Sequence, residues 1–370
     1  MKKFLRILQK QSASIIVLII LSGCTLVHRE PAFQAGKKLN PNLFRGVFHL
    51  HSEYSHDSKA PLDLIIKTAE KAGLDFVIVT DHNNLNGRAS YENTDHPERP
   101  LLIFADEVST WGDGHITGLG IKQEPPNTGD TQAIVNSIHE QGGYVVIAHP
   151  LSKRKPWTNW SIQNFDGLEV FCLSDTFYAA DLKKLLFKAF FLPPSKFIQS
   201  ILENPEAGLK LWDEHLSMGR PVAGFGAIDA HLKFYWRGLY AENLLLYFQA
   251  VTMYVKAEEL KEEKIVESLG RGRSFIAFEV YGLAHDFSFS ASLQDKNYGP
   301  GDSLSAESPI RFEIKAPEAA EIKLIHNGSV IQQEVSKTAE YETREPGYYR
   351  VEVYKDGELW IISNPIYVTG

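Results

Sequence analysis

Short β-branched or aromatic runs alternate with segments of helical period from Leu43 onward, and this alternation restricts the possible folds more than any other feature of the chain. We predict strands at 45–50 and 76–80, joined by a helix at 61–73 with Pro61 in its first turn and Gly73 at its end. The same rhythm continues through 101–104, 131–141, 144–148 and 167–171. Strand, helix, strand in this order predicts parallel βαβ units, and therefore an α/β barrel or a doubly wound sheet.

Two later segments differ from this rhythm. The range 177–218 is helical in period and is broken by prolines, so we predict a helical insertion that forms a lid or wall. Beyond about His285 the pattern changes to period-two alternation, with turn signals at Asn327-Gly328 and Asp356-Gly357. We therefore predict a first domain over 43–284 and a small antiparallel β-sandwich of immunoglobulin-like size over 285–370.

The first residues form a secretory signal pattern rather than part of the fold. A basic segment with four lysines and arginines precedes the apolar run from Ile15 to Leu21, which is too short to cross about 30 Å of hydrocarbon. The run ends in L-S-G-C, which resembles the lipobox of bacterial lipoproteins, so we expect a signal peptide over 1–23, a lipidated Cys24 and a tether over 24–42. A plain cleavable signal and a short anchor are the alternatives.

The net charge argues against a nucleic-acid-binding protein, and the cysteine content argues against a disulfide-stabilised one. The formal net charge is −8, and removal of the basic signal makes it more negative, so the positive field needed to hold a phosphate backbone is missing. Nucleic acid is therefore an unlikely partner on electrostatic grounds. The chain has two cysteines, and lipidation of Cys24 would leave Cys172 unpaired, so stability cannot depend on a disulfide.

Histidines and carboxylates recur where successive predicted strands end. His49 and His51 lie at period two, so both imidazoles point to one face of an extended chain and can bind one cation. Further candidates follow along the chain, namely Asp57, His82, Glu107, His115, His149, Asp229 and His231. Barrel enzymes assemble their active sites at the C-terminal ends of strands. Mixed nitrogen and oxygen ligands suit zinc, manganese or iron, and their number exceeds one tetrahedral ion, so we expect two or three divalent metal ions.

The motifs that carry these residues resemble those of a known family. H-L-H-S, S-H-D-S, T-D-H-N, the glutamate Glu107, A-H-P and D-A-H occur in the order found in the PHP (polymerase and histidinol phosphatase) superfamily. The resemblance covers the range from Leu43 to about Glu279, interrupted by the predicted insertion. The segments G-L-E-V-F and G-Y-Y-R-V-E-V-Y are most similar to the CehA/McbA-type metallohydrolase branch.

The resemblance implies a distorted (β/α)7 barrel with a hydrolytic centre of two or three metals. Matched motif by motif, it implies ligand roles for His49, His51, Asp57, His82, Glu107, His115, His149, Asp229 and His231. Two positions stay open. His56 could share, replace or merely flank the Asp57 ligand, and we favour Asp57. Glu169 could contact a metal or act from behind a ligand, and Asp81 is expected to orient loop amides or His82.

Two metals close together would activate a bridging water for hydrolysis. Glu107 or Asp57 is the candidate bridge, Asp229 the candidate proton acceptor, and His231 or His115 the candidate donor to the leaving group. Lys153 and Arg154 follow His149-Pro150 and could hold a phosphate, or could be a solvated loop.

We therefore expect a metal-dependent hydrolase acting on a small-molecule substrate, foremost a phosphoesterase for a phosphate ester or phosphodiester. A carbamate, ester or amide hydrolase of the CehA/McbA type is the alternative within enzymes. A lipid-anchored envelope binding protein with a structural metal site is the alternative from another class. The expected location is the bacterial cell envelope, attached to the lipid bilayer through Cys24, with the outer membrane a possible site.

Overall fold

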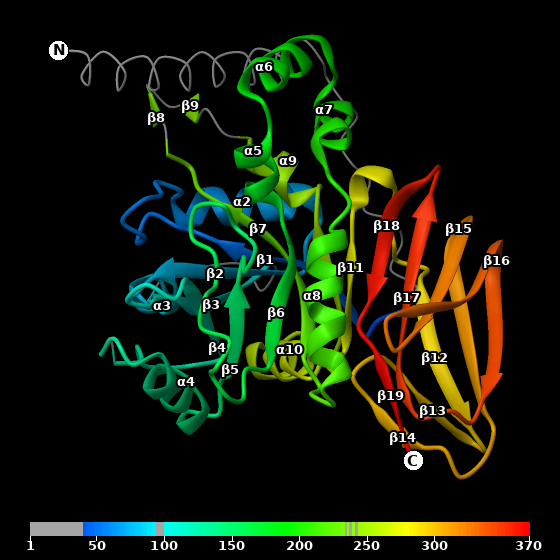
Figure 1. Ribbon diagram of the computed structural model, residues 1–370. Coiled ribbons are helices and arrows are strands. Elements are labelled where there is room, and N and C mark those ends of the chain that lie inside the picture. Colours follow the sequence, from blue (N-terminus) through cyan, green and yellow to red (C-terminus); the bar gives the residue numbers. More distant parts are fainter. Residues whose placement is uncertain (1–39, 94–99, 127, 234, 237–238, 241–242) are drawn as a thin grey trace.

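The computed structural model describes residues 40–93, 100–126, 128–233, 235–236, 239–240 and 243–370, and shows a barrel beside a β-sandwich (Figure 1). The expected α/β fold class with a seven-stranded barrel and a C-terminal sandwich is confirmed. The predicted signal peptide, Cys24 and the tether as far as residue 39 lie outside the described residues.

Seven strands close the barrel by pairing in chain order, the last with the first. They are β1 (Leu43–Leu50), β2 (Phe76–His82), β3 (Leu101–Ser109), β4 (His115–Leu119), β5 (Tyr144–Ala148), β6 (Gly167–Cys172) and β7 (Ala223–Ala230). All pairs are parallel except those of β4, which runs antiparallel to β3 and β5. The link from β3 to β4 is too short for a parallel crossover, and Gly112 and Gly114 turn it with positive φ. This hairpin is the distortion of the barrel.

Helices cover the outside of the barrel, four of them between these strands and two after β7. They are α2 (Leu62–Ala72), α3 (Asn86–Glu92), α4 (Thr131–Glu140), α8 (Glu206–Ser217), α9 (Leu244–Phe248) and α10 (Glu262–Gly270). The first matches its predicted range, because Pro61 is its N-cap and Gly73 ends it in the left-handed conformation. Gly208 lets α8 pack directly on β6, since a Cβ there would meet the carbonyl oxygen of Val170 at 2.0 Å.

The predicted insertion over 177–218 therefore needs a correction. Its last part is α8, which belongs to the helical layer of the barrel and buries Trp212 completely. The inserted helices are α5 (Leu173–Ala179), α6 (Leu182–Phe191) and α7 (Pro194–Ile201). Figure 1 shows them stacked beyond the C-terminal end of β6, together with the small hairpin of β8 (Tyr235–Trp236) and β9 (Leu239–Tyr240).

Two further strands connect the barrel to the sandwich. β10 (Thr252–Lys256) runs antiparallel to the first half of β1, and β11 (Ser274–Ala277) pairs with β10 on one side and with the sandwich strand β18 (Glu358–Ser363) on the other. A short 3-10 helix, η1 (Glu279–Tyr281), follows β11. The two domains also meet through Arg350, whose guanidinium donates hydrogen bonds of 2.9 and 2.8 Å to Asp213 on α8.

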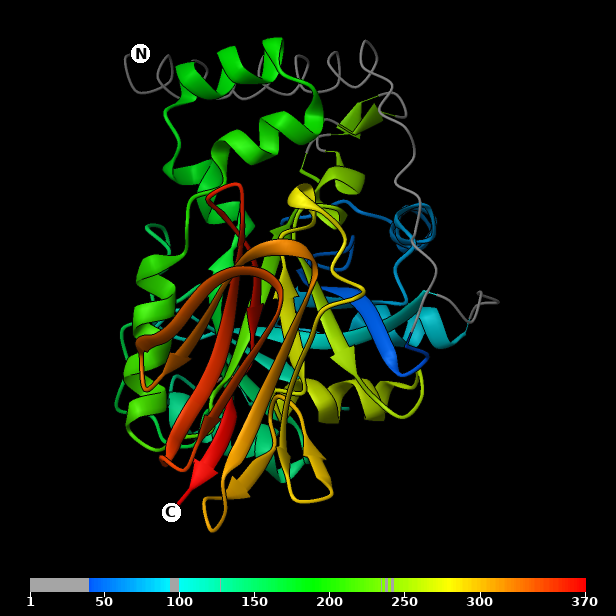
Figure 2. The same cartoon turned by 90° about the vertical axis from the view of Figure 1, so that its right-hand side faces the viewer.

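The remaining sandwich strands are β12 (Ser288–Leu293), β13 (Lys296–Tyr298), β14 (Ser303–Ser305), β15 (Ile310–His326), β16 (Ser329–Thr343), β17 (Gly347–Lys355) and β19 (Ile366–Thr369). The long hairpin of β15 and β16 takes part in both layers, since β15 pairs with β12 near its start and with β17 near its end (Figure 2). Its turn at Asn327-Gly328 has positive φ at both residues, as does Asp356-Gly357, which confirms both predicted hairpin turns.

Each domain has a hydrophobic core of its own, one inside the barrel and its helices and one between the sandwich layers. Within the described ranges, none of the helices combines the length and the apolar character that a membrane span requires.

Candidate metal centre

The first group of the site consists of His49 and His51 from β1 and its end, with Glu107 from β3 and Asp229 from β7. The Nε2 atoms of the two histidines are 3.2 Å apart, and each lies 3.2–3.3 Å from Glu107 Oε2 and 3.4–3.5 Å from Asp229 Oδ1. Ligands bound at about 2.0–2.2 Å to a tetrahedral cation lie about 3.3–3.6 Å from one another. The two histidine nitrogens therefore have, with either carboxylate oxygen, the mutual spacing that one cation requires.

The local backbone explains how both histidines reach this point. The sequence predicts a regular extended chain, but His49 has φ of 70° and the pairing register of β1 shifts beside it. The convergence of the two imidazoles therefore depends on this irregularity as well as on the period of two. His149 and Asp229 also have positive φ, of 29° and 44°. Such backbone is costly for residues other than glycine and is characteristic of functional sites.

Glu107 faces a second group through its other oxygen. Oε1 lies 2.8 Å from His115 Nδ1 and 3.0 Å from His149 Nε2, and these two nitrogens are 3.3 Å apart. The carboxylate is buried, so its charge is offset by the surrounding imidazoles rather than by water. Glu107 is therefore placed between two sets of donor atoms, one at each oxygen.

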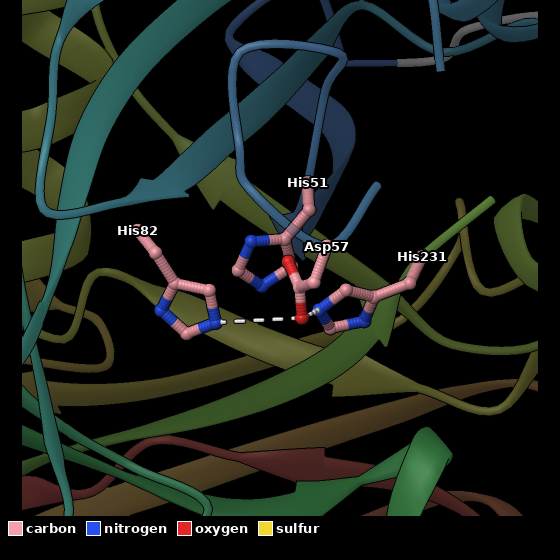
Figure 3. Close-up of side chains that lie close together, drawn as sticks. All are labelled: His51, Asp57, His82 and His231. Atoms are coloured by element: carbon pink, nitrogen blue, oxygen red, sulfur yellow. Dashed lines mark ion pairs between the residues drawn. The ribbon is translucent and has the colours of Figure 1, made fainter. Parts of the chain in front are cut away.

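A third group consists of Asp57, His82 and His231 beside His51, and these three side chains are less buried than the two histidines of the first group (Figure 3). Asp57 Oδ2 is 3.0 Å from His231 Nε2 and 3.8 Å from His82 Nε2, and the ring of His51 stacks on that of His231 at 4.0 Å. The other ring nitrogen of His82, Nδ1, is 3.2 Å from Glu107 Oε2. His56 is exposed and lies outside this group, so the geometry favours Asp57.

All nine side chains with predicted ligand roles thus come together at one end of the barrel, in overlapping groups whose donor atoms lie within 4.8 Å of one another. Their role as ligands stays a prediction. Several of their buried nitrogens and oxygens have no hydrogen-bond partner among the described residues, namely His51 Nδ1, His82 Nδ1, Glu107 Oε2, His149 Nδ1 and His231 Nε2. Buried polar atoms without partners are costly, and cations would satisfy several of them. The donor set therefore fits divalent metal ions.

Glu169 on β6 holds this arrangement from behind. Its Oε1 accepts a hydrogen bond of 2.6 Å from His49 Nδ1, and its Oε2 accepts one of 2.7 Å from the backbone N–H of His149. The first bond directs His49 Nε2 toward the cluster. Of the two roles that the sequence left open, the structure favours orientation of a ligand.

Further residues orient the site from one step away. Asp81 accepts hydrogen bonds of 2.6 Å from the N–H and from the hydroxyl of Ser52, so it fixes the loop after His51, as the sequence predicts. Sequence reasoning missed two serines. Ser174 on α5 donates a hydrogen bond to Asp229, and Ser55 donates one of 2.9 Å to Asp57. Ser55 stands within the S-H-D-S motif, whereas no local pattern points to Ser174.

The predicted phosphate-holding pair lies on the loop after β5. Lys153 and Arg154 are both exposed, and the guanidinium of Arg154 lies 4.3 Å from the ring centroid of Tyr178 on α5. The pair is thus accessible from solvent, with Arg154 packed against the inserted helices.

Carboxylates and imidazoles lie side by side in the site, and their charges shift one another's pKa values. Burial by itself lowers the pKa of His51 and of His149, but the neighbouring carboxylate of Glu107, and at His51 also that of Asp229, raises each pKa to about 9. Burial lowers the pKa of His82 to about 4. The nearby histidines hold the pKa values of Glu107 and Asp229 below their usual range, in spite of burial. Without a cation, His51 and His149 therefore carry protons at neutral pH.

Metal binding should accordingly release protons, because His51 and His149 must lose theirs to become ligands. Below about pH 9, the apparent dissociation constant for the metal should rise about tenfold for each unit by which the pH is lowered and for each proton displaced. Calorimetric titration with Zn²⁺ in buffers of different ionisation enthalpy at pH 7.5 measures the release. The release should decline as the pH rises through about 9, and equal enthalpies in all buffers at pH 7.5 would contradict the prediction.

Replacement of Glu169 by Gln should lower metal affinity by about 10- to 100-fold, because the charge that orients His49 is lost while the shape is kept. Competition with a chromophoric chelator measures the affinity, and turnover at saturating metal should recover. Asp166→Asn is the matched control, since Asp166 holds His139 at 2.8 Å outside the cluster. Equal losses in the two variants would show that Glu169 has no special role.

Comparison with known families locates one match. Residues 48–110 match the family model of the PHP domain. This range contains His49, His51, Asp57, His82 and Glu107, so the predicted resemblance is confirmed for that stretch. The CehA/McbA branch and the lipoprotein signature stay predictions.

Individual proteins similar to this chain come from several microorganisms. An uncharacterised protein of Methanocaldococcus jannaschii is 28% identical over 135 residues, which make up 33% of this chain and 78% of that protein. A two-domain protein of Bacteroides vulgatus, containing a predicted PHP-like metal-dependent phosphoesterase, aligns over 91% of this chain and 99% of its own with 13% identity and a TM-score of 0.45. An amidohydrolase of Chromobacterium violaceum aligns over 50% of this chain and 87% of its own, with 16% identity and a TM-score of 0.31.

Proposed function

We propose that the barrel is a metal-dependent hydrolase with a centre of two or three divalent cations, acting as a phosphoesterase on a small phosphate ester or phosphodiester. The observation that carries this proposal is the position of Glu107. One of its oxygens faces His49 and His51, and the other faces His115 and His149. A carboxylate shared in this way is what a pair of neighbouring cations requires.

The chain offers one set of residues for each cation. His49, His51 and Asp229 would hold one, with Glu107 Oε2 beside the two histidines. His115 and His149 would hold the second with the other oxygen of Glu107. Asp57, His82 and His231 are the set for a third. Two such cations would supply a water of lowered pKa and would offset the charge on the departing oxygen. The mixed nitrogen and oxygen donors favour zinc, manganese or iron.

Proton transfer is assigned to residues at the edge of the cluster. Asp229 is the candidate acceptor because it is ionised, its pKa being lowered by the nearby histidines in spite of burial. The same shift makes it a weak base until those histidines give up their protons to a cation. His231 Nδ1 lies 3.4 Å from Asp229 Oδ1 and its side chain is partly accessible, so it can pass a proton to a leaving group. His115 is the second candidate for that role. Lys153 and Arg154 would hold the phosphate at the mouth.

The test pairs metal analysis with turnover of three chromogenic substrates: a nitrophenyl phosphate, a nitrophenyl phosphodiester and a naphthyl carbamate. Both cores are built from residues between Phe44 and Val368, so a chain that begins at Thr25 keeps the whole described fold. Two or more cations and turnover of a phosphate ester support the proposal. Turnover of the carbamate alone would contradict it, as would fewer than one cation and no turnover after addition of Mn²⁺ or Zn²⁺.

A matched pair of histidine variants excludes a contaminating enzyme. His149→Asn should lose turnover, since His149 contacts Glu107 at 3.0 Å, whereas His139→Asn should keep it, since His139 lies on α4 and pairs with Asp166.

We also propose that Cys24 is lipidated and that the protein is held in the cell envelope. The L-S-G-C sequence after a basic and apolar start supports this proposal. Mass analysis of the membrane fraction would detect a diacylated Cys24, and a chain that keeps residues 1–23 would contradict it.

A further inference from the structure

Helix α6 carries apolar side chains on its solvent-exposed face, where polar side chains are usual. Phe187, Phe190 and Phe191 are 65%, 59% and 61% exposed, and their rings contact one another, with centroids 4.6 Å apart for Phe187 and Phe191 and 4.9 Å for Phe190 and Phe191. Leu185, on the opposite side of the helix, is buried. A soluble helix places its apolar residues inward, so a group of exposed phenylalanines indicates a surface that something else covers.

Basic side chains border this aromatic group. At 100° per residue, Lys183 lies on the same side of the helix as the three phenylalanines, and Lys184 lies beside Phe191. Both lysines are exposed. Lys188, further round, donates a hydrogen bond of 2.6 Å to the carbonyl of Ser200 on α7 and so holds α6 against its neighbour. The outward face thus combines phenylalanine with lysine, which is the composition of helices that lie in the surface of an anionic bilayer.

In the described part of the chain, Phe187 and Phe191 on this face of α6 are largely accessible to solvent. Figure 2 shows α6 as the outermost of the inserted helices, beyond α7 and apart from the strands of the sandwich. It follows α5 directly, and α5 is tied to the barrel by the hydrogen bond from Ser174 to Asp229. A surface that met this face would therefore also approach the end of the barrel where the site residues gather (Figure 1).

We propose that the outer face of α6 (Lys183, Lys184, Phe187, Phe190 and Phe191) docks on an anionic lipid bilayer, with the rings in the headgroup boundary and the lysines on the lipid phosphates. The predicted lipid at Cys24 supports this choice, because residues 25–39 can reach up to about 50 Å and would keep the folded part near a membrane. A single lipid-bearing cysteine tethers the chain, and α6 would orient it.

The test measures sedimentation with vesicles of equal parts phosphatidylcholine and phosphatidylglycerol, using the chain that begins at Thr25 and so carries no lipid. Phe187→Glu and Phe191→Glu should each weaken vesicle binding at least tenfold. Lys183→Gln and Lys184→Gln should each weaken it about fivefold, and only at low salt. Val335→Glu is the matched control, since Val335 is 79% exposed on β16 of the sandwich, and it should bind as the unchanged chain does.

Several outcomes would overturn the proposal. The first is that the wild-type chain does not sediment with the vesicles. The second is that Val335→Glu loses as much vesicle binding as the α6 variants do. The third is that the wild-type chain binds vesicles of phosphatidylcholine alone as well as it binds the mixture. Sedimentation velocity without lipid tests the alternative that a second copy of the chain covers this face. If the unchanged chain is a dimer that Phe187→Glu converts to a monomer, the face joins two copies and does not bind a membrane. The substituted side chains are exposed, so equal thermal unfolding midpoints should exclude misfolding.

Discussion

Glu107→Gln should lose bound metal and turnover together. The amide keeps the shape of the side chain but removes the negative charge between the two groups of imidazoles, and it turns one oxygen into an N–H donor that faces histidine nitrogens. Loss of about 4 kcal/mol of transition-state stabilisation corresponds to a fall of about a thousandfold in kcat/KM. Elemental analysis and turnover of the best chromogenic substrate measure the two effects on one preparation.

The neighbouring acid on the same strand is a stringent control. Asp106 is also buried, points to the other side of β3, and has its pKa raised to about 7 by burial and by Glu124. Asp106→Asn should therefore keep its metal content and turnover. A full metal complement with unchanged turnover in Glu107→Gln would refute the shared-carboxylate assignment, whatever the control does.

Arg45→Met should destabilise the fold by about 3–5 kcal/mol, because it leaves the carboxylate of Glu279 buried without its counter-charge. Arg45 Nε donates hydrogen bonds of 2.8 and 2.9 Å to the two carboxylate oxygens of Glu279. Arg45 Nη1 donates a hydrogen bond of 2.8 Å to the carbonyl oxygen of Ala72. Tyr254 donates a further hydrogen bond to Glu279. Urea unfolding of the metal-free protein measures the change without the stabilisation that bound cations would add.

A second variant distinguishes a buried charge from a lost contact. Arg45→Met combined with Glu279→Met should recover much of the loss, because removal of both charges ends the desolvation cost. Arg311→Met breaks an exposed pair with Glu340 and should leave the free energy of unfolding near that of the unchanged chain. An effect of Arg45→Met no larger than that of Arg311→Met would show that the pair is screened by water.

Prediction from sequence succeeded where local patterns determine the structure. The rhythm of strands and helices predicted parallel βαβ units in a barrel or a doubly wound sheet, and the family resemblance implied the barrel. Asn327-Gly328 predicted its hairpin turn, because a tight turn depends on neighbours in the chain. Nine predicted ligands converge because the ends of barrel strands meet whatever the details of the loops. Their gathering at one end of the barrel followed from topology, whereas the close approach of His49 and His51 also needed the positive φ of His49, which the sequence did not predict.

Long-range detail was beyond the sequence. Arg45 and Glu279 are 234 residues apart, and neither stands in a motif. The role of Glu169 stayed open because its side chain could reach a cation or a histidine, and only the three-dimensional position of β6 relative to β1 decides which. The antiparallel direction of β4 depends on the short G-D-G turn, whose consequence for the barrel is visible only with the neighbouring strands in place. The assignment of α8 to an insertion was wrong for a similar reason, since packing on β6 is not visible in its helical period.

The strand β11 belongs to both domains at once. Its amides pair with β10 of the barrel on one edge and with β18 of the sandwich on the other, in the register Phe275 with Ser363 and Ile276 with Ile362. Separation of the sandwich would bare that edge and leave its backbone groups without partners. The two domains should therefore open in a single cooperative transition, and amide protons on β18 should exchange with solvent only when the barrel itself unfolds. Occupancy of the metal centre would then protect strands of the sandwich that never touch it.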